Sequence, residues 1–325
     1  MSAMTKPSEN TMLATVENVL PVFLLIFAGW LIVASGYLQA KAGDALSDFV
    51  FKVAVPVLLF RTIAEADFHG AFPVQLWIAY FSAVAVTWTV AFFMAKRFFR
   101  TDHRTATVTG ISSAFANTIF IGLPLVDRAV GPEGLVALSI LIAVHLPVMM
   151  IASTVLIERA EQRDTGKRHG NFSGLLKSMG RNLRRNPLVF GIIGGGLYHL
   201  TGLPLGGVPK NLMDQVSGMA GPAALLSLGM AMRRYGFAGN GQIALGATVL
   251  KLMLMPALVF VFATVMGLSP EWRAALVLIA SVPTGVNAWL IAVQFNTAEA
   301  LAASAITITT GVGVLSVTFW AWMVS

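Results

Sequence analysis

The chain has 325 residues, of which 56% are hydrophobic and only 11% are charged, and this composition excludes an ordinary soluble domain. Cysteine is absent, which excludes a disulfide framework and thiolate metal ligands. The formal net charge of +7 could point to nucleic acid, but membrane topology accounts for the basic residues, so we expect no nucleic-acid partner. The first residues lack the charged start and cleavage site of a signal peptide, so we expect the first helix to be retained.

Apolar stretches predict about ten transmembrane helices, because a hydrocarbon core of about 30 Å needs roughly 20 apolar residues per helix. The first half contains the stretches Val16 to Leu38, Leu46 to Ile63, Val74 to Phe98, Ala106 to Leu125 and Leu135 to Ile157. The second half contains the stretches Leu188 to Leu203, Met213 to Met232, Ile243 to Gly267, Ala274 to Phe295 and Leu301 to Val324. We therefore divide the chain into a first repeat (1–157), a basic cytoplasmic loop (158–185) and a second repeat (186–325).

The basic residues fall mainly on one side of this topology. The loops that follow the third, fifth and seventh stretches contain most of them, including Lys96, Arg97, Arg100, Arg104, Arg159, Arg163, Arg233 and Arg234. Cytoplasmic loops of membrane proteins hold most of the lysine and arginine, so both termini are predicted to lie outside the cytoplasm.

An offset of 166 residues, the separation of Pro21 from Pro187, aligns the two halves of the chain. The same offset pairs several Gly, Asp, Pro and Glu residues, namely Gly29 with Gly195, Gly36 with Gly202, Asp48 with Asp214, Pro56 with Pro222 and Glu133 with Glu299. Five spans is an odd number, so the second copy must cross the membrane in the opposite orientation. Inverted repeats of this kind are typical of secondary transporters, whose binding site lies between the repeats near the midplane.

The fourth and ninth stretches contain polar residues, Gly and Pro near mid-span, at Ser112 to Pro124 and Ser281 to Trp289. Unwound backbone at membrane depth is tolerated only where protein or a watery cavity satisfies it, so we expect two broken helices that cross. Helix N-termini there would suit a carboxylate without a buried arginine. The predicted substrate-binding residues are Asn117, Thr118, Pro283, Thr284, Gly285 and Asn287. In the simpler alternative, Pro and Gly only kink packed helices.

Three more residues are candidates for support of the crossing or for coupling. Lys251, in the eighth stretch, has no acidic neighbour and could bind an anion or bond to freed carbonyls. His145 could relay protons or bond a neighbouring helix, and Ser113 is part of the polar run of the fourth stretch. No Asp or Glu is central in any predicted span, which disfavours cation exchange.

Nearly the whole chain resembles the auxin efflux carrier family, whose bacterial members include permeases for malonate and other organic acids. The most specific matches are Pro56 to Ala64, Asn117 to Pro124, and Lys251-Leu252 before Pro256. The resemblance implies a fold like that of bile-acid symporters, with scaffold and transport domains, crossed helices 4 and 9, and an elevator-type movement. It also implies that Asn117 contacts the substrate carboxylate. Helix 9 departs from the family pattern, and the short basic loop is typical of bacterial members, so we expect an inner (plasma) membrane location.

The sequence thus predicts an all-α polytopic membrane protein that transports a small organic anion, a mono- or dicarboxylate such as malonate, without a cofactor or a metal. Uniport, proton symport through His145 and sodium symport stay open, in that order, as does symport of another organic solute. A membrane-embedded enzyme, or a retinal-type protein that uses Lys251, is a remote alternative because no HExxH or Asp-rich motif lies in a span. The substrate, the direction of transport and a homodimer are also left open.

Overall fold

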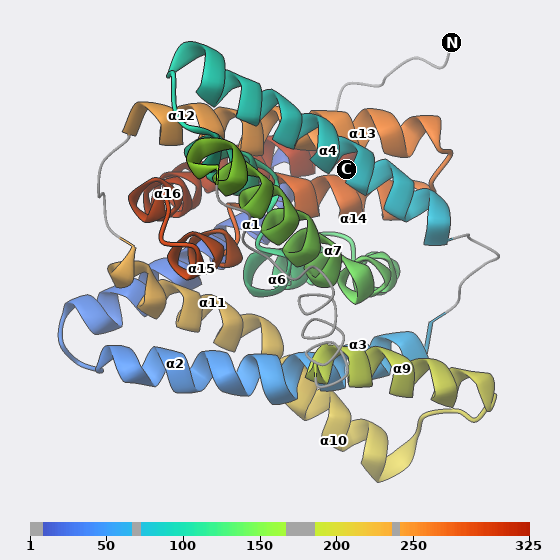
Figure 1. The fold of residues 1–325 in the computed structure, drawn as a ribbon. Helices are drawn as coiled ribbons and strands as arrows, with labels where there is room; N and C mark the ends of the chain where they lie inside the picture. The colour runs from blue at the N-terminus through green and yellow to red at the C-terminus, as the bar shows by residue number, and fades with distance from the viewer. Residues whose placement is uncertain (1–8, 67–72, 167–185, 236–240) are drawn as a thin grey trace.

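The computed structural model describes residues 9–66, 73–166, 186–235 and 241–325, and these form helices joined by short turns, with one isolated β-bridge (Figure 1). The elements of the first half are α1 (Glu9–Ala34), α2 (Ala40–Phe49), η1 (Val50–Ala54), α3 (Val55–Ala64), α4 (Pro73–Phe98), α5 (His103–Ala114), η2 (Thr118–Gly122), α6 (Leu123–Ala129) and α7 (Pro132–Thr165). The elements of the second half are α9 (Pro187–Leu200), α10 (Gly207–Gly218), α11 (Ala220–Ala231), η3 (Met232–Arg234), α12 (Gly241–Val249), η4 (Leu250–Leu254), α13 (Met255–Val265), α14 (Pro270–Ser281), α15 (Asn287–Gln294) and α16 (Glu299–Val324).

Five helical segments of the described chain are long and apolar enough to cross a membrane. They are Met12–Ala34, Pro73–Phe98, Pro132–Thr165, Gly241–Val265 and Glu299–Val324. The remaining predicted spans coincide with shorter helices, such as the apolar helix α9, or with helices joined through an interruption. The prediction of an all-helical, polytopic membrane protein is therefore confirmed.

Three turns have the wider π-helical form, and each lies just before a proline. The turns η1, η2 and η4 precede Pro56, Pro124 and Pro256, respectively. Proline has no backbone N–H and its ring clashes with the carbonyl group four residues earlier, so the turn before it widens instead of closing normally. The helices continue through η1 and η4, whereas η2 follows an interruption of the helix.

The helices pack as two groups, and each group combines segments from both halves of the chain. The smaller group consists of residues 9–66 and 186–235, and its main contacts join α3 to α9 and α1 to α11. The larger group consists of residues 73–166 and 241–325, in which α4 packs on α5 and α13, and α14 packs on α7 and α16. In Figure 1, helices α2, α3, α9 and α10 lie together at the bottom, and α4, α12, α13 and α14 lie at the top.

Glycine allows helix backbones to touch inside the smaller group. A Cβ atom at Gly29 of α1 would lie 2.2 Å from Leu226 O of α11, and one at Gly195 of α9 would lie 2.5 Å from Phe60 O of α3. Small residues at such contacts let membrane helices approach closely and gain van der Waals contact. The helix pairs α1–α11 and α3–α9 are therefore close-packed.

Helix α7 extends farther than its apolar stretch. It continues past the predicted span end at Ile157 to Thr165 and ends at Gly166, which has the left-handed backbone conformation (φ +69°) favoured at helix C-termini. The first residues of the predicted basic loop, 158–165, are therefore helical. The rest of that loop, 167–185, lies outside the described residues.

Candidate functional site

Two of the predicted spans in the larger group, the fourth and the ninth, are each interrupted by a short non-helical segment. Residues 115–117 lie between α5 and η2, and residues 282–286 lie between α14 and α15. Phe115 (φ −88°, ψ 100°) and Val282 (φ −66°, ψ 156°) both have extended backbones. We name these two segments together the crossing.

The two extended segments of the crossing pair with each other as a short antiparallel bridge. Asn117 N donates to Pro283 O at 3.0 Å, and Gly285 N donates to Phe115 O at 2.7 Å. A Cβ atom at Gly285 would lie 2.9 Å from Ala116 O, so a side chain there would push the segments apart. The pairing gives hydrogen-bond partners to backbone groups that the helix ends leave free.

The side chain of Thr284 ties the crossing to the helices around it. It is fully buried, and its Oγ1 donates to Ser112 O at 2.7 Å, in the last turn of α5. Its backbone N donates to Thr309 Oγ1 of α16 at 3.1 Å. A Cβ atom at Gly313 of α16 would lie 2.9 Å from Pro283 Cγ, so α16 packs closely on the crossing.

A cavity of about 320 Å³ lies where the smaller group meets the crossing. From the larger group, residues of the crossing and of the helix starts that follow it line the cavity, including Ala116, Asn117, Thr118, Gly285 and Asn287. From the smaller group, residues of α2, of η1 and of the segment around η3 line it, including Asp44, Ser47, Phe51, Arg234 and Tyr235. The volume is at the low end for ligand pockets and therefore suits a small molecule.

Hydrogen-bond donors concentrate at the crossing side of this cavity. Asn117 precedes η2, and its Oδ1 accepts from Phe120 N at 3.3 Å, which leaves its amide nitrogen as a donor. Asn287 is the first residue of α15. At this start, Ala288 N donates to Gly285 O at 3.0 Å and Trp289 N donates to Val286 O at 3.1 Å, so α15 contributes the partial positive charge of its first turn. The cavity wall formed by these two starts is consequently suited to an anionic group.

The cavity also contains an ion pair that the sequence analysis assigned to no site. Arg234 binds Asp44 at the cavity mouth, and their side chains are 41% and 55% exposed. Next to this pair, Tyr235 stacks edge-on against Trp289 with ring centroids 5.5 Å apart. Burial raises the pKa of Tyr235 to about 12, so its hydroxyl stays neutral at physiological pH. An arginine paired with an aspartate thus accompanies the uncharged donors of the crossing.

Three of the residues predicted for the site or its support lie behind the cavity wall. Pro283 and Thr284 are buried within the crossing and do not line the cavity. Ser113 is fully buried in α5, where its Oγ donates to Thr109 O of the same helix at 2.9 Å. The structure thus brings Asn117, Thr118, Gly285 and Asn287 to the cavity and uses the other three in packing.

The two titratable residues singled out in the sequence are buried and do not line the cavity. Lys251 lies in the π-helical turn η4 and donates to Ala280 O, in the last turn of α14 before the crossing. His145 of α7 is ringed by aromatic side chains, with centroid distances of 5.4 Å to Phe115 and 5.6 Å to Tyr80. Within the described part of the chain, His145 Nε2 and the Tyr80 hydroxyl have no hydrogen-bond partner.

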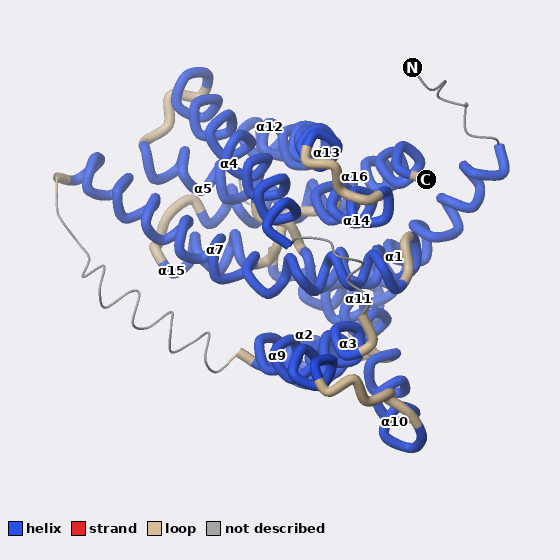
Figure 2. The backbone as a smooth tube through the Cα atoms, turned by 90° about the vertical axis from the view of Figure 1, so that its right-hand side faces the viewer, coloured by secondary structure: helices blue, strands red, loops and turns tan. Residues whose placement is uncertain are grey.

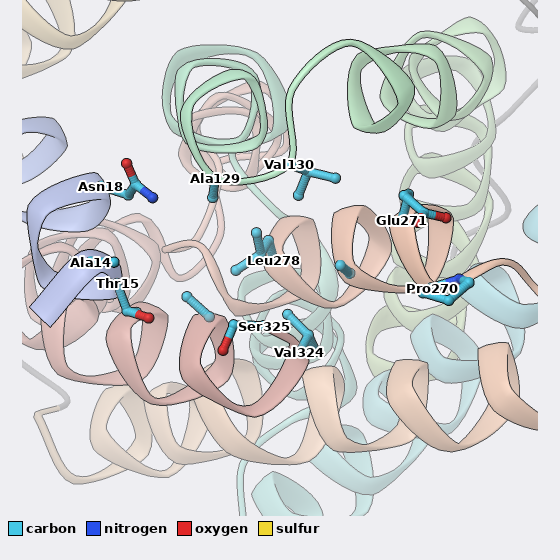
Figure 3. Close-up of a pocket in the computed structure, with 12 residues that line it drawn as sticks. Ala14, Thr15, Asn18, Ala129, Val130, Pro270, Glu271, Leu278, Val324 and Ser325 are labelled. Carbon is cyan, nitrogen blue, oxygen red and sulfur yellow. The ribbon is translucent and has the colours of Figure 1, made fainter. Parts of the chain in front are cut away.

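A second cavity, of about 290 Å³, lies near the C-terminus (Figure 3). It is lined by the side chains of α1, α14 and the end of α16, such as Asn18, Leu278 and Val324. Its one charged lining residue is Glu271, a carboxylate that would repel an anion. The cavity at the crossing is therefore the better candidate for an anionic ligand.

Known proteins resemble this chain over nearly its full length. Residues 14–321 match the family described as "Membrane transport protein". An "Uncharacterized transporter" of Methanothermobacter thermautotrophicus is 24% identical over 309 residues, which cover 95% of this chain and 98% of that protein. A Rhizobium meliloti protein named "Putative malonate transporter" is 24% identical over 309 residues, or 92% of each chain. An uncharacterized transporter of Methanocaldococcus jannaschii is 22% identical over 312 residues, 94% of this chain and 98% of its own.

The family match and the full-length relatives agree with the helical, apolar architecture. Each of the three relatives carries a name that describes a transporter, and none is named as an enzyme. The motifs around Pro56, Asn117 and Lys251 already resembled one carrier family. The chain therefore belongs to the family of membrane transport proteins known as auxin efflux carriers, and it is a membrane transporter rather than an enzyme.

Proposed function

We propose that this protein is a secondary transporter of a small organic anion, a mono- or dicarboxylate such as malonate, and that it works by alternating access. The observation that carries the proposal is the cavity at the crossing, where two helix starts and the amide of Asn117 face a volume of about 320 Å³. An amide donor and the partial positive charge of helix starts stabilise a carboxylate without burying an uncompensated positive charge. The malonate transporter name of the Rhizobium meliloti relative is consistent with this substrate class.

The position of the cavity supports an elevator-type movement. The cavity is bounded on one side by the crossing, in the larger group, and on the other by α2 and α11, in the smaller group. The mouth contains Arg234, which the sequence analysis places on the cytoplasmic side, together with its partner Asp44. Toward the opposite end the groups are in contact, since a Cβ atom at Gly221 would lie 3.2 Å from Pro124 Cβ. This arrangement fits a state open to the cytoplasm.

The contacts of the helices support a duplication with five spans in each half, the second copy inverted. Gly29 and Gly195 are related by the offset of 166 residues, and so are their contact partners, Leu226 and Phe60. The backbone bond from Asn117 to Pro283 joins two positions related by the same offset. If the two halves were similar only by chance, equivalent residues would not be expected to make equivalent contacts. The repeated contacts therefore favour a duplication.

The coupling of transport follows the order set out from the sequence. Uniport is placed first because Asp44, the carboxylate that lines the cavity, is paired with Arg234. Proton symport is second, through His145, which is buried against Phe115 of the crossing and has an unpartnered ring nitrogen within the described chain. Sodium symport is third.

Flux measurements on the purified protein in proteoliposomes test the proposed site. We expect uptake or efflux of radiolabelled malonate or a similar acid, and we expect Asn117→Ala to lower kcat/KM by about tenfold or more, as loss of a hydrogen bond to a charged group does. The matched control is Asn211→Ala, because Asn211 is exposed on α10 and lines no cavity described here.

The two parts of the proposal fail separately in this assay. Absence of flux for every small mono- and dicarboxylate with the wild-type protein would contradict the substrate class. Flux that is equal in the wild type, Asn117→Ala and Asn211→Ala would contradict the assignment of the site while leaving the substrate class intact.

A further inference from the structure

A groove at one end of the larger group combines aromatic side chains with arginines. It lies between α4, α5 and α7 and has a volume of about 270 Å³. These three helices pack against one another, as Figure 2 shows at its left. The groove is separate from the cavity at the crossing, with which it shares no lining residue.

One part of the groove is apolar and partly exposed. Its floor is Trp88, which is only 7% exposed and lies against α5, where a Cβ atom at Gly110 would be 2.2 Å from the indole ring. Its sides include Phe93 and Leu156, which are 61% and 37% exposed. A tryptophan between exposed apolar side chains is typical of the membrane–water boundary.

The other part of the groove is positively charged. Arg159 and Arg163 both line it and lie one helical turn apart on the same face of α7, beyond the apolar stretch that ends at Ile157. In the ranges that the structure describes, neither arginine forms an ion pair.

Two acidic side chains that follow Arg159 in α7, Glu161 and Asp164, already have other partners. Asp164 accepts hydrogen bonds from the ring and the backbone N–H of His103, at 2.6 and 3.1 Å, and from Arg104 N at 3.0 Å. Glu161 pairs with Arg104 at 3.9 Å. Neither of these two carboxylates neutralises Arg159 or Arg163, whose charges can therefore bind an external anion.

We propose that this groove binds an anionic phospholipid, with the phosphate at Arg159 and Arg163 and the start of one acyl chain along Phe93 and Leu156. Basic pockets between membrane helices suit lipid headgroups, because the charge lies at headgroup depth next to hydrocarbon. A soluble phosphate ion would use the arginines alone and leave the aromatic floor unfilled. The occupant is therefore a lipid, and its negative charge selects it over a zwitterionic one.

Native mass spectrometry of the full chain in detergent, titrated with phosphatidylglycerol, tests the proposal. We expect saturable binding that Arg159→Ala with Arg163→Ala weakens by about 25-fold, since each basic side chain near an anionic surface contributes about fivefold. Replacing both arginines by lysine keeps the charges and should restore binding to within about threefold. Arg97 is exposed near the end of α4, close in the chain to the groove residues Trp88 and Phe93, but it does not line the groove. Arg97→Ala should therefore leave binding unchanged.

Several outcomes would overturn the proposal. Phosphatidylcholine that binds as tightly as phosphatidylglycerol would show that charge does not select the lipid. Inorganic phosphate at millimolar concentration that displaces the lipid fully would show a site for a soluble ion. An equal loss of binding in Arg97→Ala would show only a general attraction to positive charge. None of these results bears on malonate flux or on Asn117, so the transport proposal is tested independently.

Discussion

Replacing Thr284 by valine would remove a single hydrogen bond from the crossing while keeping the shape of the side chain. Thr284 is fully buried, and its Oγ1 donates to Ser112 O at 2.7 Å. Ser112 O lies in the last turn of α5. In the described structure, the Thr284 hydroxyl is the donor from outside the helix that bonds to this carbonyl oxygen. Leaving such an acceptor buried without a partner costs about 1–3 kcal/mol.

The expected result of Thr284→Val is a less stable protein with a displaced crossing. With an unfolding entropy of about 2.1 cal/mol/K per residue, a loss of about 1 kcal/mol lowers the melting temperature of a chain of this length by about 1.5 °C, so we expect a decrease of at least about 1.5 °C by thermal melting in detergent. Malonate flux in proteoliposomes should fall as well, because Gly285 and Asn117 depend on the pairing of the two segments.

Two control variants separate this effect from a general loss of threonine. Thr284→Ser keeps the hydroxyl and should melt close to the wild type. Thr264→Val removes a hydroxyl bonded within its own helix, to Phe260 O at 2.7 Å, but at an exposed position where the cost is small. A melting temperature and a flux for Thr284→Val that both equal those of Thr264→Val would refute the structural role assigned to this bond.

Two further predictions concern the cavity mouth and the orientation of the chain. Asp44→Asn removes the carboxylate that pairs with Arg234 and should lower the KM for malonate by up to about fivefold, because the freed arginine can attract the anion. Asp44→Glu keeps the carboxylate and should not lower the KM. A raised KM in Asp44→Asn would argue against access of the substrate to Arg234. Because the chain contains no cysteine, Ser325→Cys should react with an impermeant maleimide in intact cells, whereas Arg97→Cys should react only after lysis, and the opposite pattern would reverse the predicted topology.

Much of the helical architecture was predictable because apolar windows mark membrane-length helices directly. The stretch predicted from Val74 to Phe98 corresponds to α4, Pro73–Phe98. The predicted span that ends at Ile157 covers only part of α7, because the helix continues to Thr165 through polar residues. Helical hydrogen bonds persist in water, so the end of hydrophobicity is not the end of a helix.

The π-helical turns were not predicted, although each has a local signal. Proline at positions 56, 124 and 256 was noted in the sequence, but it was interpreted as a kink or a family motif. Whether a helix accommodates proline by a kink, a break or a wider turn depends on which neighbours satisfy the freed carbonyl groups. These neighbours come from other parts of the chain, so the local sequence does not reveal them.

The cavity was predictable in part. Asn117 and Gly285 stood out because polar residues, Gly and Pro interrupt apolar spans, and this signal is local in the sequence. Arg234 was counted only as a topology marker, since its ion pair with Asp44 joins residues that are distant in the chain. Thr284 was expected in the site, but its hydroxyl bonds to Ser112 O instead of facing the cavity.

The two walls of the cavity differ in chemistry, and this difference affects influx and efflux of the anion differently. The donors of Asn117 and Asn287 belong to the larger group, whereas Arg234 and Asp44 belong to the smaller one. If the larger group carries the anion across while the smaller group stays fixed, the arginine meets the anion on one side of the membrane only. Half-saturating concentrations would then be unequal for influx and efflux, even though a passive carrier reaches the same final distribution from either side.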